Sequence, residues 1–203
     1  MDIGTAYGWF DTTVNFSTLD GPFDMSAQML VATVSTPLDA DWSLTGLVGS
    51  ILRGHLGISR SEPASQLAMS PGGVVGVSLQ RTWIPQTALA PFLSTSFKLA
   101  CSFVPRVGQQ QEPLLALDLR ASITVGKTIA NVVTPYLSAR LFGGPIVWFR
   151  QSQTVWGTDI YHAQLAVGVT LEIPLSSGTA LIMSLDASPL LERSVSASMT
   201  LAL

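Results

Sequence analysis

Apolar and polar residues alternate along much of the chain with a period of two, which is the pattern of a β-strand with two different faces. In residues 93–103 the odd positions are mostly apolar and the even positions are mostly polar. This pattern returns about every twenty residues, with turn-forming residues between the repeats. We predict about ten antiparallel strands, at residues 4–17, 24–36, 41–55, 72–84, 91–104, 114–126, 133–143, 156–173, 178–188 and 192–203.

The first three predicted strands carry apolar residues on both faces. Tyr7 and Trp9 lie at odd positions of the first strand. Phe10, Val14 and Phe16 lie at its even positions. A strand with one buried face should be apolar on that face only. The orientation of these strands is therefore left open, and a total of eight strands is kept as an alternative.

The composition indicates that lipid surrounds the strands. Charged residues make up 11% of the chain and hydrophobic residues 47%, whereas about a quarter of an average soluble domain is charged. A transmembrane helix needs about 18 or more consecutive apolar residues, and no apolar run in this sequence approaches that length. A net charge of −3 without a basic stripe argues against a nucleic-acid partner. The single cysteine, Cys101, excludes an internal disulfide framework.

The polar faces of the predicted strands carry Ser, Thr, Gly and Gln, whereas a surface in water would carry more Lys and Glu. Small polar residues suit the inside of a barrel, where strands curve closely around a lumen. We therefore expect residues 1–203 to form one all-β domain, an up-and-down transmembrane β-barrel with apolar faces toward lipid. The alternative is a soluble β-barrel or sandwich whose apolar faces form the core.

Charged and amide side chains on the polar faces are predicted to form a network across the lumen. A turn centred near residue 109 places Lys98 opposite Asp118 or Arg120. A turn centred near residue 129 places Asp118 opposite Arg140. Charges inside a lumen must be paired or hydrated. The predicted network consists of Lys98, Asp118, Arg120, Arg140, Tyr136, His162, Gln164 and Gln80.

Aromatic residues gather toward both ends of the predicted strands, as they do at the two interfaces of membrane barrels. Trp42 and Trp83 stand beside short turns. Arg81, near Trp83 on the apolar face, can extend its guanidinium group to an interface. The predicted interface aromatics are Trp42, Trp83, Trp148, Phe149, Trp156 and Tyr161.

The C-terminal strand and the connections resemble those of small outer-membrane β-barrel proteins of Gram-negative bacteria. Val195, Ala197, Met199 and Leu201 alternate with small polar residues up to Leu203, where that class usually has an aromatic residue. Several connections after even strands are short and several after odd strands are long, as in this class. The short ones are 37–40, 84–90, 127–131 and 174–177, and the long ones are 54–73, 105–113 and 142–156.

This resemblance implies several properties of the chain. The short turns and both termini would face the periplasm, and the long loops would lie outside the cell. The chain would reside in the outer membrane, as a mature sequence without its signal peptide, in contact with lipid and lipopolysaccharide. The resemblance points to an architecture and to no particular family, so it implies no catalytic residues.

The remaining motifs point to no active chemistry. Gly126-Lys127-Thr128 lacks the earlier glycine of a phosphate-binding loop, because position 121 is Ala. Two histidines are too few for a histidine-rich metal site, and we expect no metal or cofactor. Asp159 and His162 could act as an acid and a base. Asp186 and Glu192 flank the last connection and could bind a cation together, although we expect solvated loop acids there.

The sequence thus favours a non-enzymatic scaffold, or a subunit of an envelope assembly, with a narrow and plugged lumen. A narrow pore for ions or small solutes is the first alternative, and a lipid-modifying enzyme that uses His162 is the second. Loops 54–73 and 142–156 are candidates for contact with a protein partner. The second loop is unusually apolar and glycine-rich, so it could also fold over the barrel mouth or enter the membrane interface.

Overall fold

The computed structural model describes residues 1–58, 66–87, 90–151, 153–176, 178–190 and 192–203. Within these residues thirteen strands form one antiparallel sheet. They are β1 (Asp2–Phe16), β2 (Pro22–Pro37), β3 (Trp42–Ile58), β4 (Leu67–Met69), β5 (Gly72–Ile84), β6 (Phe92–Val104), β7 (Leu114–Gly126), β8 (Val133–Gly143), β9 (Pro145–Arg150), β10 (Gln153–Asp159), β11 (Ala163–Ser176), β12 (Thr179–Ser188) and β13 (Arg193–Ala202). No helix of the described residues is long and apolar enough to cross a membrane.

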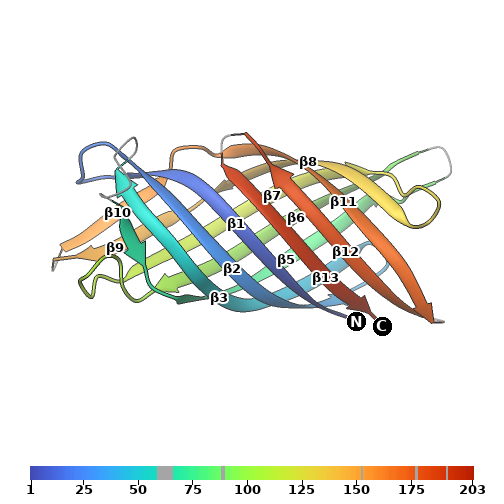
Figure 1. Cartoon of the computed structure of the whole chain (residues 1–203). Helices are drawn as coiled ribbons and strands as arrows, with labels where there is room; N and C mark the ends of the chain where they lie inside the picture. The colour runs from blue at the N-terminus through green and yellow to red at the C-terminus, as the bar shows by residue number, and fades with distance from the viewer. Residues whose placement is uncertain (59–65, 88–89, 152, 177, 191) are drawn as a thin grey trace.

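Ten of the strands close into a barrel, which confirms the predicted fold class (Figure 1). The path runs from β7 through β6, β5, β3, β2, β1, β13, β12 and β11 to β8, and pairing between β7 and β8 closes it. All of these pairings are antiparallel. The eight-strand alternative is therefore wrong.

One predicted strand and one predicted loop need correction. The segment 156–173 is not continuous, because β10 ends at Asp159 and β11 begins at Ala163. The segment 142–156 is not a plain loop either, since β9 and β10 pair as a hairpin within it. Both strands are short, and their apolar residues face two different surroundings. A single alternating face therefore does not emerge from this part of the sequence.

The two ends of the barrel differ. Both chain termini and the connections after β2, β5, β7 and β11 lie at one end, which we call the terminal end (Figure 1, right). β12 and β13 are ten residues long and stop well short of the opposite, far end. Such a length is about what a tilted strand needs to cross a bilayer. β1, β2 and β3 have 15, 16 and 17 residues and continue beyond that point.

A second, narrower ring closes the far end, and we call it the far extension. At the far end, the hairpin of β9 and β10 takes the place of β8, β11, β12 and β13 between β7 and β1. Here β10 pairs with β1 and β9 pairs with β7. β4 pairs with β3, and Met69 forms a bridge with Val107. The far extension thus consists of β4, β9, β10 and the far ends of β1, β2, β3, β6 and β7. The rest is the membrane barrel.

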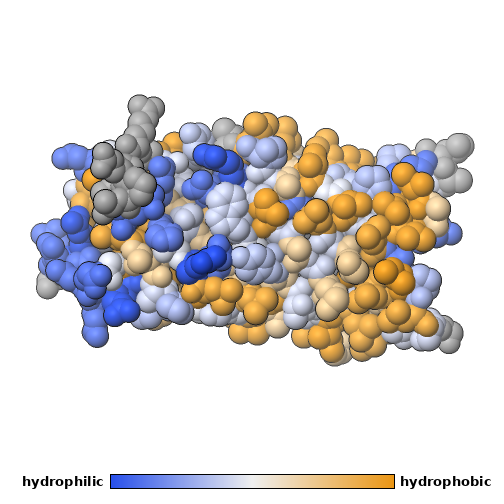
Figure 2. Space-filling model, in the orientation of Figure 1, coloured by the Kyte–Doolittle hydropathy of each residue, from blue (hydrophilic) through white to orange (hydrophobic). Residues whose placement is uncertain are grey.

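The far extension is apolar inside and polar outside. Trp148 packs against Phe16 and Phe23 at ring-centroid distances of 5.7 and 6.5 Å. The buried core comprises Val14, Phe16, Phe23, Met25, Ala27, Ile51, Leu56, Met69, Val104, Val107, Leu114, Ile146, Trp148 and Val155. The opposite faces of the same strands carry residues such as Asp24, Ser26, Asn15, Arg53 and His55. Figure 2 shows the resulting hydrophilic surface over this end.

The membrane barrel has the reverse distribution. Its outward side chains are apolar and exposed, among them Val34, Val48, Val75, Phe97, Ile123, Leu141, Leu165, Val167, Leu185 and Met199. They form a hydrophobic belt, and Figure 2 shows the part of the apolar surface that faces the viewer at the terminal end. Such a belt needs lipid around it, since a soluble monomer rarely exposes so large an apolar surface. The soluble-barrel alternative is therefore excluded.

Strand β1 contains this reversal within itself. Ile3 and Tyr7 face outward in the membrane barrel, while the inward positions there are Gly4 and Gly8. Farther along the same strand Asn15 faces outward, and Val14 and Phe16 are buried inside. The two apolar phases of the first predicted strands therefore belong to two different environments.

Candidate functional site

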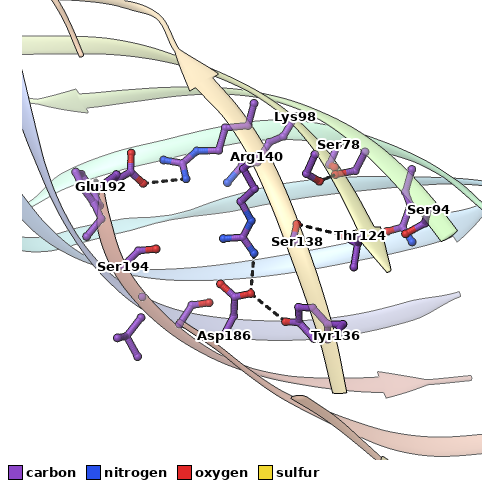
Figure 3. Close-up of a pocket in the computed structure, with 18 of the residues that line it drawn as sticks. Ser78, Ser94, Lys98, Thr124, Tyr136, Ser138, Arg140, Asp186, Glu192 and Ser194 are labelled. Carbon is purple, nitrogen blue, oxygen red and sulfur yellow. Dashed lines mark hydrogen bonds and ion pairs between the residues drawn. The ribbon is translucent and has the colours of Figure 1, made fainter. Parts of the chain in front are cut away.

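A polar cavity of about 580 Å³ occupies the lumen of the membrane barrel (Figure 3). Its walls are rich in hydroxyl groups because Ser and Thr occupy the inward positions of most strands. Neighbouring strands share these hydroxyls: the Ser96 and Ser122 hydroxyls lie 2.7 Å apart, and Thr124 donates to Ser138 at 3.1 Å. Since every hydroxyl can both donate and accept, the wall suits water or a polar solute.

Charged side chains cross the lumen on the far side of this cavity, in what we call the ionic layer. Arg120 contacts two carboxylates, with its Nε 2.8 Å from Asp118 Oδ2 and its Nη1 3.1 Å from Glu192 Oε1. Arg140 Nη2 lies 2.7 Å from Asp186 Oδ2. The ionic layer consists of Lys98, Asp118, Arg120, Arg140, Asp186 and Glu192. Lys98 makes no ion pair among the described residues, and its position opposite Arg120 places two cations side by side.

The predicted pairing of Asp118 with Arg140 is wrong. Arg140 lies opposite Ser122, so the register is displaced from the one that a turn near residue 129 would give. Asp118 instead contacts Arg120, two residues along its own strand. Arg140 reaches Asp186 on β12, although β11 lies between their strands. This contact across the lumen is visible in Figure 3.

Asp186 and Glu192 are not solvated loop acids. Only 7% of Asp186 and 2% of Glu192 are exposed, and both point into the lumen. Asp186 also accepts a hydrogen bond of 3.1 Å from the Tyr136 hydroxyl. The sequence did indicate an inward side chain for Asp186, because this residue alternates with apolar residues at the same parity as Ser184 and Ser188 of β12. The same signal existed for Glu192, which has the parity of the inward Ser194 and Ser196 in the predicted strand 192–203.

The other predicted lumen residues divide into two groups. Tyr136 and Gln80 line the cavity together with the charged residues. Gln164 is buried and donates to the Glu192 carbonyl and to Ser194 Oγ at 3.3 and 3.2 Å. His162 is not a lumen residue, because it is exposed in the connection before β11. The chain turns there, so the alternation of β11 does not extend back to position 162.

The apolar core of the far extension lies directly beyond the ionic layer. Asp159, at the end of β10, stands at this boundary and accepts a hydrogen bond of 3.2 Å from the Thr12 hydroxyl. Burial raises the pKa of Asp159 above its ordinary value, and the Thr12 hydrogen bond opposes that change. From the terminal end, the interior is thus first hydroxyl-lined, then ionic and finally dry. A cavity of about 90 Å³ continues beyond the ionic layer among Met25, Val104 and Ile146. The buried side chains of Phe16, Leu56 and Trp148, which do not line this cavity, close the lumen.

The predicted interface aromatics occupy three environments. Trp42 and Trp83 lie on the outer surface near the terminal end, on either side of Arg81. Phe149, Trp156 and Tyr161 are exposed toward the far end, with 44, 55 and 38% of their surface accessible. Trp148 is not at an interface, because it is 1% exposed in the core of the far extension. The alternation of β9 separates it from its neighbour Phe149.

The predicted partner-binding loops and the two histidines are the remaining candidate sites. Residues 59–65 and 152, which belong to the predicted partner-binding loops 54–73 and 142–156, lie outside the described residues. Within the described part of the chain, no group of three or more His, Cys, Asp or Glu side chains is placed to hold a metal ion. Neither histidine side chain there is hydrogen bonded to a carboxylate or a hydroxyl group.

Comparison with solved structures identifies the architecture. No protein-family model and no curated protein matches the chain. The transport unit of the autotransporter AIDA-I from Escherichia coli is similar in fold, with a TM-score of 0.51 and 10% identity over 99% of this chain and 89% of that chain. The translocator domain of the autotransporter NalP from Neisseria meningitidis has a TM-score of 0.49 and 7% identity, over 99% and 88% of the two chains.

An outer membrane channel from Pseudomonas putida F1 matches with a TM-score of 0.46 and 10% identity, over 100% of this chain and 95% of that chain. At these identities the likeness concerns the fold alone. The closed antiparallel barrel and its lipid-facing belt agree with that fold. Together they identify the fold of the chain as that of an outer-membrane β-barrel.

Proposed function

We propose that this barrel is a non-enzymatic scaffold that holds the far extension at the membrane surface, either alone or as a subunit of an envelope assembly. The observation that carries this proposal is the blind lumen. An open channel needs a continuous wet path, whereas fourteen buried apolar residues of the described chain occupy the interior of the far extension. The far extension has a buried apolar core and a polar outer surface, so it can remain folded in water outside the bilayer.

The proposed orientation places the terminal end in the periplasm. The connections after β2, β7 and β11 are short, and the two longest ones, after β3 and β6, lie at the far end, as in outer-membrane barrels generally. The polar outer surface of the far extension supports the same orientation, because it must lie in water on one side of the membrane. The far extension would then face the outside of the cell.

The absence of enzymatic activity is part of the proposal. Nucleophilic and acid–base catalysis need a base within hydrogen-bond reach of its partner. His162, the base considered from the sequence, is exposed and lies outside the polar cavity. A lipid-modifying activity that disappears in His162→Ala would contradict this part of the proposal.

Single-channel recording in planar lipid bilayers tests the blind lumen. We expect no conductance steps from the folded wild-type chain. The matched control replaces residues 145–159 with a short Gly-Ser linker, which removes the hairpin between β1 and β7 and should produce measurable conductance. Heat-modifiable migration on gels shows whether each chain is folded. Steady unitary steps from the wild type would overturn the proposal.

A narrow pore is the second candidate function, and the hydroxyl-lined cavity favours it. A pore requires the core around Trp148 to open, so its conductance should change when that core is altered. If the wild type conducts and Trp148→Ala raises the conductance, the pore becomes the better account.

A further inference from the structure

Arg81 is an arginine on the lipid-facing surface of the membrane barrel. It lies opposite Trp42 on β3 and Thr95 on β6, among outward apolar residues. Its Cζ is 3.6 Å from the centroid of the Trp83 ring and 5.2 Å from that of the Trp42 ring. Trp83 is held in turn, because its Nε1 donates to Thr95 Oγ1 at 2.9 Å. The two indoles therefore hold the guanidinium group in place.

The charge of Arg81 is not compensated by the described part of the chain. No ion pair involves it there, and its Nε is buried without a hydrogen-bond partner. A guanidinium group that rests on aromatic faces keeps an N–H edge for an anion. A lipid-facing cation needs a counter-charge nearby. At this position the headgroup region of the bilayer can supply it.

An apolar groove of about 950 Å³ begins beside this arginine and crosses the outer surface of β6, β7, β8 and β11. Trp42, Leu79 and Thr95 line its beginning. Its lining includes three alanines, Ala121, Ala139 and Ala163, that alternate across the strands with larger residues. Because the alanines leave space between large neighbours, the belt is hollowed here.

We propose that Arg81 and the groove form one binding site for a glycerophospholipid. The guanidinium group and its two tryptophans receive the phosphate, and the groove receives acyl chain. The combination of one uncompensated cation with a long apolar hollow fits an amphiphile with an anionic head. The choice of glycerophospholipid over lipopolysaccharide rests on the proposed orientation, which places Arg81 in the periplasmic leaflet.

Other occupants of the groove fit less well. A second copy of this barrel would bring its belt, whose outward side chains are apolar and offer no phosphate-like partner for Arg81. A membrane-spanning segment of another protein could fill the hollow, but the groove alone would then determine binding. Variants of Arg81 and variants of the groove distinguish these occupants. Only an anionic lipid requires both the guanidinium group and the groove.

Native mass spectrometry of the detergent-solubilised full chain with palmitoyl-oleoyl-phosphatidylglycerol tests the site. We expect retention of the lipid to weaken about tenfold in Arg81→Gln, as the loss of a charge-assisted contact implies. Arg81→Lys should give an intermediate result, because it keeps the charge and loses the stacking. Ala139→Phe should weaken retention by filling the groove. Matched controls are Arg53→Gln, at the other edge of the belt, and Ala197→Phe, outside the groove.

Equal lipid retention in all variants would show only the general lipid shell and would overturn the proposal. So would a dimer, or a co-purifying chain, that Ala139→Phe removes while lipid retention stays unchanged. Preferential, Arg81-dependent retention of purified lipopolysaccharide would also overturn it, together with the assigned leaflet. Heat-modifiable migration confirms that each variant is folded. Because conductance is measured separately, failure of the lipid site leaves the scaffold proposal standing.

Discussion

The membrane barrel and the far extension share the long strands β1, β2 and β3, yet their apolar side chains point in opposite directions. In the membrane barrel Val34 faces lipid while the inward neighbours are small. In the far extension Phe23 and Met25 of the same strand point inward. Alternation therefore shows that a strand has two unlike faces, but the surroundings decide which face is apolar.

Ring size explains what fills each interior. The ten-stranded membrane barrel leaves space that Ser, Thr and the ionic layer occupy with a cavity. The narrower ring of the far extension brings its walls close enough for large rings to meet, as Phe16 and Phe23 do at 5.4 Å. Its exterior is in water, so burying Trp148 and Leu56 stabilises it as in a soluble protein. In lipid, by contrast, the closed hydrogen-bond network is what holds the strands.

The largest difference should appear when a tryptophan is removed from the hairpin of β9 and β10. Trp148→Ala empties part of the dry core and should lower the free energy of unfolding by about 3–5 kcal/mol. Trp156→Ala, on the exposed face of the same hairpin, should cost well under half of that. Urea unfolding of both variants in detergent micelles measures the difference. Equal losses would mean that the far extension has no dry core.

A lysine introduced on the outer surface should reduce stability more in the membrane barrel than in the far extension. Met183→Lys places an ammonium group on the lipid face near the middle of β12 and should cost about 2–4 kcal/mol. Asn15→Lys, on the outer face of the far extension, should change stability by less than about 0.5 kcal/mol. Folding yields into phosphatidylcholine vesicles report both. A tolerated lysine at 183 would contradict the position of the lipid belt.

The ionic layer should show a smaller but specific coupling. Arg140→Met leaves Asp186 without its ion pair and should cost about 1.5–3 kcal/mol. The double variant Arg140→Met with Asp186→Leu should recover part of this loss, since no charge is left unpaired. A double-mutant cycle by urea unfolding measures the coupling. Strict additivity would show that the two side chains do not interact.

The smallest expected effect concerns Asp159 in the far extension. Because the folded protein raises its pKa, the folded state binds the proton more tightly than the unfolded state. This contribution to stability is present at low pH and is lost as pH rises through the raised pKa. Asp159→Asn should therefore increase stability at neutral pH and flatten the profile above pH ~4. A decrease at neutral pH would mean that the carboxylate is better solvated than its burial indicates.

Sequence reasoning succeeded where one environment covers a whole strand. β6, β12 and β13 lie largely within the membrane barrel, so their alternation gives the lipid face directly. It failed for β9 and β10, with six and seven residues, because each is too short to show a period and faces a dry core and a polar exterior. The alternation of apolar and polar residues therefore could not show that the Trp148 side chain is buried.

The ionic layer shows a second limit. The even positions of β6, β7 and β8 correctly placed Lys98, Asp118 and Arg140 on inward faces. Their partners could not be deduced, since a displacement of the register by a few residues changes every opposite pair. The ion pair of Arg140 with Asp186 also joins strands that are not neighbours in the sheet. Such contacts depend on the curvature of the closed barrel, which periodicity does not contain.

Spin labels along the outward face of β1 test the reversal most directly. In a Cys101→Ser background, single cysteines would be introduced at Ile3, Thr5, Thr13 and Asn15, and the folded protein would be placed in phosphatidylcholine vesicles. We expect oxygen to relax the labels at positions 3 and 5 and a water-soluble nickel complex to relax those at 13 and 15, although all four share one face. The same response at all four positions would contradict a membrane barrel that continues into an inverted far extension.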